Sequence, residues 1–152
     1  MKKIIYTFTL GLMFAIFLSP VKLSAQSELY DQGTVWEMTF VKIKANMGED
    51  YLKGLTKTWK ASMDLLVKEK LIRSYKVLIG SASNRADFDL LLMIESENMA
   101  SFDPDPIRDK KMAELEKKIM DGMGDEYKKT IVNYETLREI TGNKIMREIF
   151  LK

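Results

Sequence analysis

The stretch that most restricts the fold is "DFDLLLMIES" at residues 87–96, because its apolar run from Leu90 to Ile94 has no polar break. A strand with one face in water alternates apolar and polar side chains, whereas a strand covered on both faces can be apolar throughout. The run is also too short for a typical helix. We therefore expect a strand over residues 88–95 that is covered on both faces.

The N-terminus, residues 1–25, has the three parts of a secretory signal peptide: a positive start, an apolar middle (residues 4–18) and a small-residue cleavage site, "LSA", before Gln26. The alternative is a single membrane anchor, which needs about 20 apolar residues, and the helix-breaking Ser19-Pro20 pair favours cleavage. Since no cysteine follows the apolar middle, a lipid-anchored lipoprotein is excluded. We expect an exported protein, periplasmic or secreted, without membrane attachment after cleavage.

Composition narrows the partners of the remaining chain. Because residues 1–25 contain three of the 24 basic residues and no acidic one, the rest has 21 basic and 22 acidic residues, a formal net charge of −1. A near-neutral domain lacks the positive surface that nucleic-acid binding needs. We expect a flexible lead-in over residues 26–33 and one domain over residues 34–152, held together by packing because there are no cysteines.

The chain contains no histidine. This excludes histidine-dependent catalytic triads and removes the commonest metal and haem ligand. The acids Asp103, Asp105 and Asp109 in "DPDPIRD" lack the glycine and the terminal glutamate of a calcium-binding EF-hand loop, and helix capping explains them without an ion. We therefore predict neither a metal nor a cofactor.

The first half of the domain predicts a strand followed by a helix. The strand begins near residue 34 and carries apolar side chains on both faces, with Trp36, Met38 and Phe40 on one and Val35, Val41 and Ile43 on the other. A helix of about 20 residues follows, because apolar side chains recur every three or four positions, at Leu52, Leu55, Trp59, Met63 and Leu66.

The second half predicts two strands, a helix and a last strand. Residues 71–80 and 88–95, joined by a polar loop, indicate an antiparallel hairpin. A second helix begins at Pro104 or Pro106 after an aspartate cap, and Ile107, Met112, Leu115 and Ile119 form its apolar stripe. Residues 126–140 fit a helix nearly as well as an extended chain. "TGN" at residues 141–143 indicates a break before the closing strand.

The order strand, helix, strand, strand, helix, strand predicts an α+β fold of ferredoxin-like βαββαβ topology, with a four-stranded antiparallel sheet and both helices on one face. The other face would leave several large apolar side chains in water, forgoing about 1.5–3 kcal/mol each. An identical subunit related by a two-fold axis is the simplest cover. We therefore expect a homodimer through the open sheet face.

Two segments, "VWEMTFVKIKANMGEDYLKGLTKTWK" and "DFDLLLMIESENMASFD", carry a resemblance to a known family. Over residues 33–151 the chain resembles the dimeric α/β-barrel superfamily, which includes antibiotic-biosynthesis-type monooxygenases and the EthD-like and NIPSNAP-like domains. The resemblance implies a barrel-like dimer, with a pocket between sheet and helices or within the barrel. The matching patterns contain no diagnostic catalytic signature, so they bear on the fold more than on the activity.

The predicted ligand site lies on the strands. Trp36, Met38 and Tyr75, with Arg73 as the cation, would line a pocket for a flat or acidic small molecule. The alternative is that the aromatic side chains are core residues and Arg73 belongs to a salt bridge at the rim. Trp59 is expected to pack on the sheet.

Glu37 and Asp89 are the carboxylates on strands that could serve as a base if burial raised their pKa, and edge exposure is the alternative for both. The resembled superfamily includes cofactor-free monooxygenases, which need no histidine, whereas its haem-dependent branches use a proximal histidine that this chain lacks. We predict a small-molecule-binding protein with the ligand residues Trp36, Met38, Arg73, Tyr75 and Asp89. The alternatives are a cofactor-independent oxygenase- or isomerase-like enzyme acting on an aromatic or quinone-like compound, and a structural or partner-binding module of the envelope.

Overall fold

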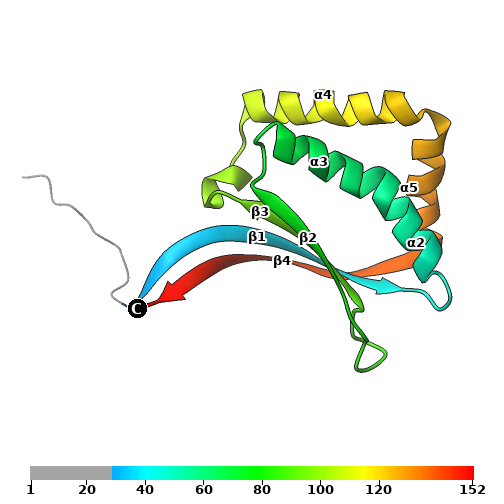
Figure 1. Ribbon diagram of the computed structural model, residues 1–152, viewed down its shortest axis with the longest axis horizontal. Coiled ribbons are helices and arrows are strands. Elements are labelled where there is room, and N and C mark those ends of the chain that lie inside the picture. The colour runs from blue at the N-terminus through cyan, green and yellow to red at the C-terminus, as the bar shows by residue number, and fades with distance from the viewer. Residues whose placement is uncertain (1–28) are drawn as a thin grey trace, which may run out of the picture.

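The computed structural model describes residues 29–152 (Figure 1). The predicted signal peptide and residues 26–28 of the lead-in lie outside the described residues. The strands are β1 (Tyr30–Ile43), β2 (Ser74–Ile79), β3 (Leu90–Ser96) and β4 (Arg138–Leu151). The helices are α2 (Gly48–Leu55), η2 (Thr56–Lys60), α3 (Ala61–Lys68), η3 (Met99–Phe102), α4 (Pro106–Met123) and α5 (Asp125–Leu137).

The four strands form one antiparallel sheet in the order β2-β3-β1-β4. One helical connection joins β1 to β2 and a second joins β3 to β4, so that the element order is βαββαβ when α4 and α5 are taken as two parts of the second connection. This topology confirms the predicted α+β, ferredoxin-like fold class. The dimeric part of that prediction stays a prediction.

Strand pairing divides the side chains of the sheet between two faces. Val41 is opposite Leu90 in the register of β1 and β3, and both pack in the core with Tyr51 of α2, so they mark the face that the helices cover. Because side chains alternate along a strand, Trp36 and Met38 point to the other face, which we call the open face. Figure 1 shows α2, α3 and α4 on one side of the sheet, and within residues 29–152 no helix lies over the other side.

The core lies between the central strands and the helices α2 and α5. Its buried members come from β1, β3, α2 and α5, and Ile43 and Trp59 pack against them at the periphery; they are Val41, Leu90, Leu92, Tyr51, Leu55, Tyr134 and Leu137. The apolar run of β3 therefore has one covered face, which carries Leu90 and Leu92. On its other face, Leu91 and Met93 are only partly buried.

The first helical connection agrees with the predicted helix of about 20 residues. The segments α2, η2 and α3 follow one another from Gly48 to Lys68, with Glu49 and Asp50 in the first turn, where negative charge is favourable. The middle segment, η2, is a π-helix, a rare distortion that often occurs at functional sites. The sequence periodicity does not indicate this distortion, which changes the directions of the side chains around Trp59.

The second helical connection consists of two helices. Asp105 caps α4, since its carboxylate accepts hydrogen bonds from the backbone N–H groups of Ile107 at 3.0 Å and Arg108 at 3.1 Å. Gly124 ends α4 with φ of 56° and ψ of −134°, a conformation that glycine adopts at little cost. The chain then turns into α5, so the segment that was ambiguous in the sequence is helical as far as Leu137.

The helix α4 lies on the same face of the sheet as α2 and α3, as predicted, but in a second layer. It packs on α3 and α5, and in Figure 1 it runs above α3, away from the strands. Part of the predicted apolar stripe is consequently in solvent, because Ile107 is 83% exposed whereas Ile119 is buried. The helix α5 runs from the end of α4 toward the sheet, so α4 itself stays at a distance from the strands (Figure 1).

The strands β1 and β4 are both longer than the strands predicted from the sequence. β1 begins at Tyr30, opposite Leu151, so residues 30–33 of the predicted lead-in belong to the sheet. β4 begins at Arg138 and continues through residues 141–143, where the sequence predicted a break. A register shift opposite Phe40 and Val41 absorbs the extra residue there, as β-bulges do.

Several large apolar side chains of the open face and the two edge strands are exposed. On the open face these include Leu78, which is 53% exposed, Met146 and Phe150.

In the described part of the chain, no helix is long and apolar enough to cross a membrane.

Candidate functional site

A cavity of about 940 Å³, open to solvent on part of its surface, lies between the helices and the start of β4. It lies between η2 and α3 on one side, α4 on the second and α5 on the third. Its lining is mostly apolar: Trp59, Met63, Leu66, Met112, Ala113, Leu115, Ile119, Ile131 and Ile140, together with the polar or charged Thr58, Ser62, Asp109, Glu116, Tyr127, Tyr134, Glu135 and Arg138. Its volume is at the upper end of the range for small-molecule pockets.

Arg138 is the only basic residue among the lining residues of this cavity. It is the first residue of β4, directly after the end of α5, and it is partly buried. Its guanidinium carbon lies 5.2 Å from the ring centre of Tyr134 and 5.7 Å from that of Tyr51. These distances permit favourable cation–π interactions, and the two rings themselves meet edge to face at 5.5 Å.

The charge of Arg138 has no acidic partner within residues 29–152, since no carboxylate oxygen lies within 4.0 Å of its guanidinium nitrogens. Its Nε atom is buried and makes no hydrogen bond there. Buried polar groups normally have hydrogen-bond partners, and buried charges are normally paired. The site therefore has unused hydrogen-bonding capacity around one positive charge.

The two tyrosines do not neutralise that charge. Burial raises the pKa of Tyr51 to about 12, although the charge of Arg138 and a hydrogen bond from its side chain oppose the rise. Burial also raises the pKa of Tyr134, against the opposing effects of the Thr58 hydroxyl and Arg138. Both phenols are therefore uncharged near neutral pH.

A pair of hydroxyl groups connects the π-helical segment to α5. The Thr58 hydroxyl donates to the carbonyl oxygen of Gly54 at 3.1 Å and is also in hydrogen-bonding contact with the Tyr134 hydroxyl. Because a threonine has one hydroxyl proton and a carbonyl can only accept, Tyr134 is the donor when both bonds form. The Tyr134 oxygen then retains its accepting capacity beside the cavity.

The three carboxylates that line the cavity, those of Asp109, Glu116 and Glu135, belong to exposed residues. Asp109 is also paired with Arg108 at 3.3 Å. Charges in contact with water are strongly screened, whereas a partly buried charge is screened less. The cavity thus combines an apolar interior, exposed acids and one partly buried cation.

The predicted ligand residues do not form one pocket. Trp36 is opposite Glu95, and Glu95 is opposite Ser74, so the neighbour of Ser74, Tyr75, points to the other face of the sheet. Its ring meets Trp59 edge to face at 5.3 Å under the helices, and its hydroxyl donates to Asp64. The prediction of a pocket shared by Trp36 and Tyr75 is therefore wrong, although binding by either residue alone stays a prediction.

The remaining predicted ligand residues are spread over the sheet. Met38 lies on the open face with Trp36, whose ring is covered by the Lys76 ammonium at 4.5 Å. Arg73 and Asp89 lie at opposite ends of the β2–β3 pair, because the Arg73 N–H donates to Glu95 while the Asp89 carbonyl accepts from Gly80.

The two candidate bases have ordinary structural environments. Glu37 is exposed. The carboxylate of Asp89 accepts a hydrogen bond from the backbone N–H of Ile43 at 2.9 Å, which holds the end of β1. The predicted enzyme site, in which Trp36 and Tyr75 would enclose a buried carboxylate, is not assembled.

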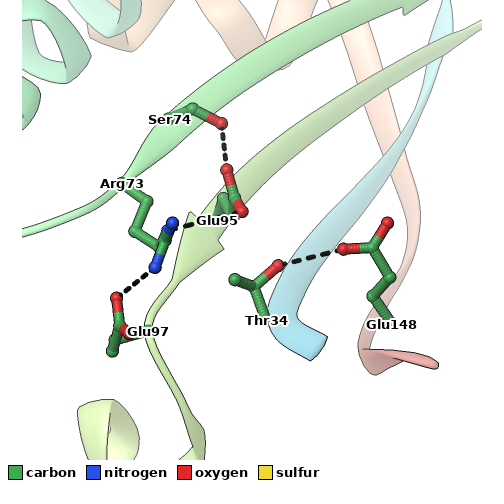
Figure 2. Close-up of polar contacts among 6 residues, drawn as sticks. All are labelled: Thr34, Arg73, Ser74, Glu95, Glu97 and Glu148. Carbon is green, nitrogen blue, oxygen red and sulfur yellow. Dashed lines mark hydrogen bonds and ion pairs between the residues drawn. The ribbon is translucent and has the colours of Figure 1, made fainter. Parts of the chain in front are cut away.

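Arg73 belongs to a second polar cluster, at one end of the open face, which Figure 2 shows. Its guanidinium pairs with Glu97 at 2.6 Å and lies 3.7 Å from Glu95, whose side chain is 17% exposed. The Ser74 hydroxyl donates to Glu95 at 2.5 Å, while the Thr34 hydroxyl donates to Glu148 at 3.4 Å (Figure 2). This arrangement agrees with the alternative that Arg73 belongs to a salt bridge at the rim.

Within residues 29–152, no group of three or more acidic side chains could hold a metal ion. The glutamates of the second cluster are instead paired with Arg73 or with hydroxyl groups.

Three residues that shape the cavity were not predicted to belong to a site: Thr58, Tyr134 and Arg138. Tyr134 was visible only as part of a helical pattern in the ambiguous segment. The signal that was available is the single arginine at the end of that pattern, preceded at position 134 by an aromatic residue one helical turn away. Nothing in the sequence indicates that Tyr51, more than 80 positions earlier, lies beside them.

Comparison with known proteins adds little to these observations. No family model and no curated protein matches the chain. Among solved structures, the chain is similar to a dimeric protein of unknown function with a ferredoxin-like fold from Bacteroides fragilis, with 15% sequence identity, coverage of 81% of this chain and 100% of that chain, and a TM-score of 0.38. A likeness of this extent carries no argument about assembly or function. The class of the protein, an α+β protein of ferredoxin-like topology, follows from its own strand order.

Glu95 of the second cluster should make stability depend on pH. Burial raises its pKa, but the Ser74 hydrogen bond, the Thr34 hydroxyl and the charges of Arg73 and Lys76 outweigh this effect and hold the pKa below the ordinary value of 4.5. A carboxyl with a depressed pKa stabilises the folded state above the unfolded-state pKa. That contribution is lost as the pH falls below 4.5 through the folded-state value.

We expect Ser74→Ala to lower the free energy of unfolding at neutral pH by about 1.5 kcal/mol, because a hydrogen bond to a charged group is lost. The variant should also lose less stability than the wild type on acidification through this range. Urea unfolding at a series of pH values measures both effects, with Ser81→Ala in the exposed loop as the control. Identical acid dependence of Ser74→Ala and the wild type would contradict this role of Glu95.

Proposed function

We propose that the protein binds a small, largely apolar and flat molecule in the cavity between the helices. The observation that carries the proposal is the cavity of about 940 Å³ with its mostly apolar lining. Ligand sites are typically concave and apolar with a few convergent polar groups, and here those groups are Thr58, Tyr134 and Arg138.

The way the cavity is built supports the proposal. Gly124 separates α4 from α5, so α4 rests on α3 instead of filling the space above α5 and the start of β4. A protein whose second helix served only to cover the sheet would gain stability by closing this gap, because apolar surface left accessible to water forgoes about 25 cal/mol per Å². The separation is explained if a ligand occupies the space.

Trp59 provides a reporter for binding, since it lines the cavity whereas the other tryptophan, Trp36, lies on the open face. In a Trp36→Phe variant, the fluorescence of Trp59 should be quenched in a saturable manner by 2-methyl-1,4-naphthoquinone, a neutral flat compound. In a Trp59→Phe variant, the same compound should quench Trp36 only in proportion to its concentration.

Filling the cavity should prevent binding. Ala113 lines it from α4, so Ala113→Phe should weaken the binding of the quinone by about tenfold or more, whereas Ala86→Phe in the exposed β2–β3 loop should not. Saturable quenching that survives Ala113→Phe, or that reports on Trp36 and not Trp59, would refute binding in this cavity.

The homodimer is a second part of the proposal. The open face carries the apolar side chains Trp36, Met38, Phe40, Leu78, Met146 and Phe150. It also carries charges of both signs, Lys76 and Lys144 beside Glu95 and Glu148. A two-fold axis places each such patch against its own copy, so opposite charges on one face can pair between two identical subunits.

Light scattering of the protein beginning at Gln26, at micromolar concentration, should give twice the mass of one chain. Leu78→Glu should shift the mass toward that of one chain because the charge enters the apolar patch. Its neighbour Ile79 is 65% exposed but points to the helix face, so Ile79→Glu is the matched control and should stay dimeric. A monomeric wild type would exclude the dimer.

Export, to the periplasm or the medium, is the third part of the proposal and rests on the sequence of residues 1–25 alone. When the full chain is expressed in a bacterium, its exported form should have the mass of a chain that begins at Gln26 or at the cyclised form of that residue. Ala25→Phe should block processing, because the cleavage site requires a small residue. Mature protein that retains Met1 would contradict a cleaved signal.

A further inference from the structure

We propose that the ligand of the cavity is an anion, a flat molecule with one carboxylate or similar acidic group, and that Arg138 binds this group. The inference rests on the proposed function and adds the chemical class of the ligand. It depends on three observations: Arg138 lines the cavity, two tyrosine rings hold its guanidinium, and no acidic side chain within residues 29–152 pairs with it.

Arg138 is held at the wall of the cavity with little freedom to turn away. Its guanidinium lies near the rings of Tyr134 and Tyr51, at 5.2 and 5.7 Å from the ring centres. Tyr51 is fully buried, and the Tyr134 hydroxyl is tied to Thr58 of the π-helical segment. The positive group is therefore positioned before any ligand arrives, which lowers the entropy cost of binding.

The unmet interactions of this group define what it would bind. A guanidinium has five N–H donors in a planar fork that matches a carboxylate, and here no acidic side chain within residues 29–152 pairs with them. The buried Nε has no hydrogen-bond acceptor in the same part of the chain. An anionic group from outside would supply both the missing charge and the missing acceptor.

Arg138 also stabilises α5, because it follows the last turn of that helix, where a positive charge is favourable. That role accounts for a cation at this position but leaves its burial beside an apolar cavity unexplained, since an exposed side chain would serve the helix equally well. The carboxylates of Asp109, Glu116 and Glu135, which also line the cavity, would favour a cation instead. They are exposed, so their charges are screened more than that of Arg138.

Three compounds of nearly equal size test the inference by calorimetry: the anion 2-naphthoate, the neutral 2-naphthamide and the cation 2-naphthylmethylammonium. We expect the wild type to bind 2-naphthoate about tenfold more tightly than 2-naphthamide, as expected for a charge-assisted hydrogen bond, and to bind the cation most weakly. In Arg138→Gln the preference for the anion should disappear, whereas Arg138→Lys should retain part of it.

The ratio of the two affinities separates recognition from a structural role, because a loss of folding would weaken both compounds together. Lys117→Gln is the matched control: it removes one positive charge from an exposed position of α4 that does not line the cavity, and it should leave the ratio unchanged. Circular dichroism checks the fold of each variant. If Arg138→Gln does not fold, the wild-type ratio together with Arg138→Lys still decides the question.

The outcomes distinguish the inference from the proposed function. If the amide binds as tightly as the acid, or if Arg138→Gln keeps the preference, the anion is refuted while binding in the cavity stands. If the cation binds most tightly, the exposed acids determine the ligand and the inference is overturned. If none of the three compounds, nor the quinone, binds the wild type, the proposed function fails and the inference fails with it.

Discussion

The packing of α5 against α2 determines much of the rest of the structure. Tyr134 and Leu137 of α5 are buried with Tyr51 and Leu55 of α2, above the central strands. This contact places α5 where a single second helix would otherwise lie, and Gly124 allows the chain to turn sharply into it. The preceding helix, α4, consequently packs on α3. The space left between α3, α4 and α5 is the cavity.

The same contact explains the polar character of the cavity. It brings two phenols together and leaves Arg138 at the end of α5 between their rings and the empty space. The π-helical segment contributes from the other side, because Thr58 bonds to the carbonyl of Gly54 and to the Tyr134 hydroxyl. A distorted helix and an unpaired, partly buried charge are both costly features, and such features tend to occur at functional sites.

How far the sequence predicts this structure can be followed in particular residues. The stripe from Leu52 to Leu66 predicted the first helical connection, since apolar periodicity depends only on local sequence, but its first member, Leu52, is exposed. Asp105 was predicted as one of two possible caps for the same reason. The pocket of Trp36 and Tyr75 failed because the face of a strand residue depends on register, and a difference of one residue between paired strands reverses the face.

The sequence by itself determined the element order, the ferredoxin-like topology and the excess of apolar side chains on the sheet, because these depend on patterns within a few consecutive residues. It also excluded chemistry that needs histidine or cysteine. Only the tertiary structure decided that Tyr51, Tyr134 and Arg138 meet, that α4 lies away from the sheet and that a cavity results. These features arise from contacts between distant segments, whose geometry depends on how whole helices pack, and no local pattern encodes it.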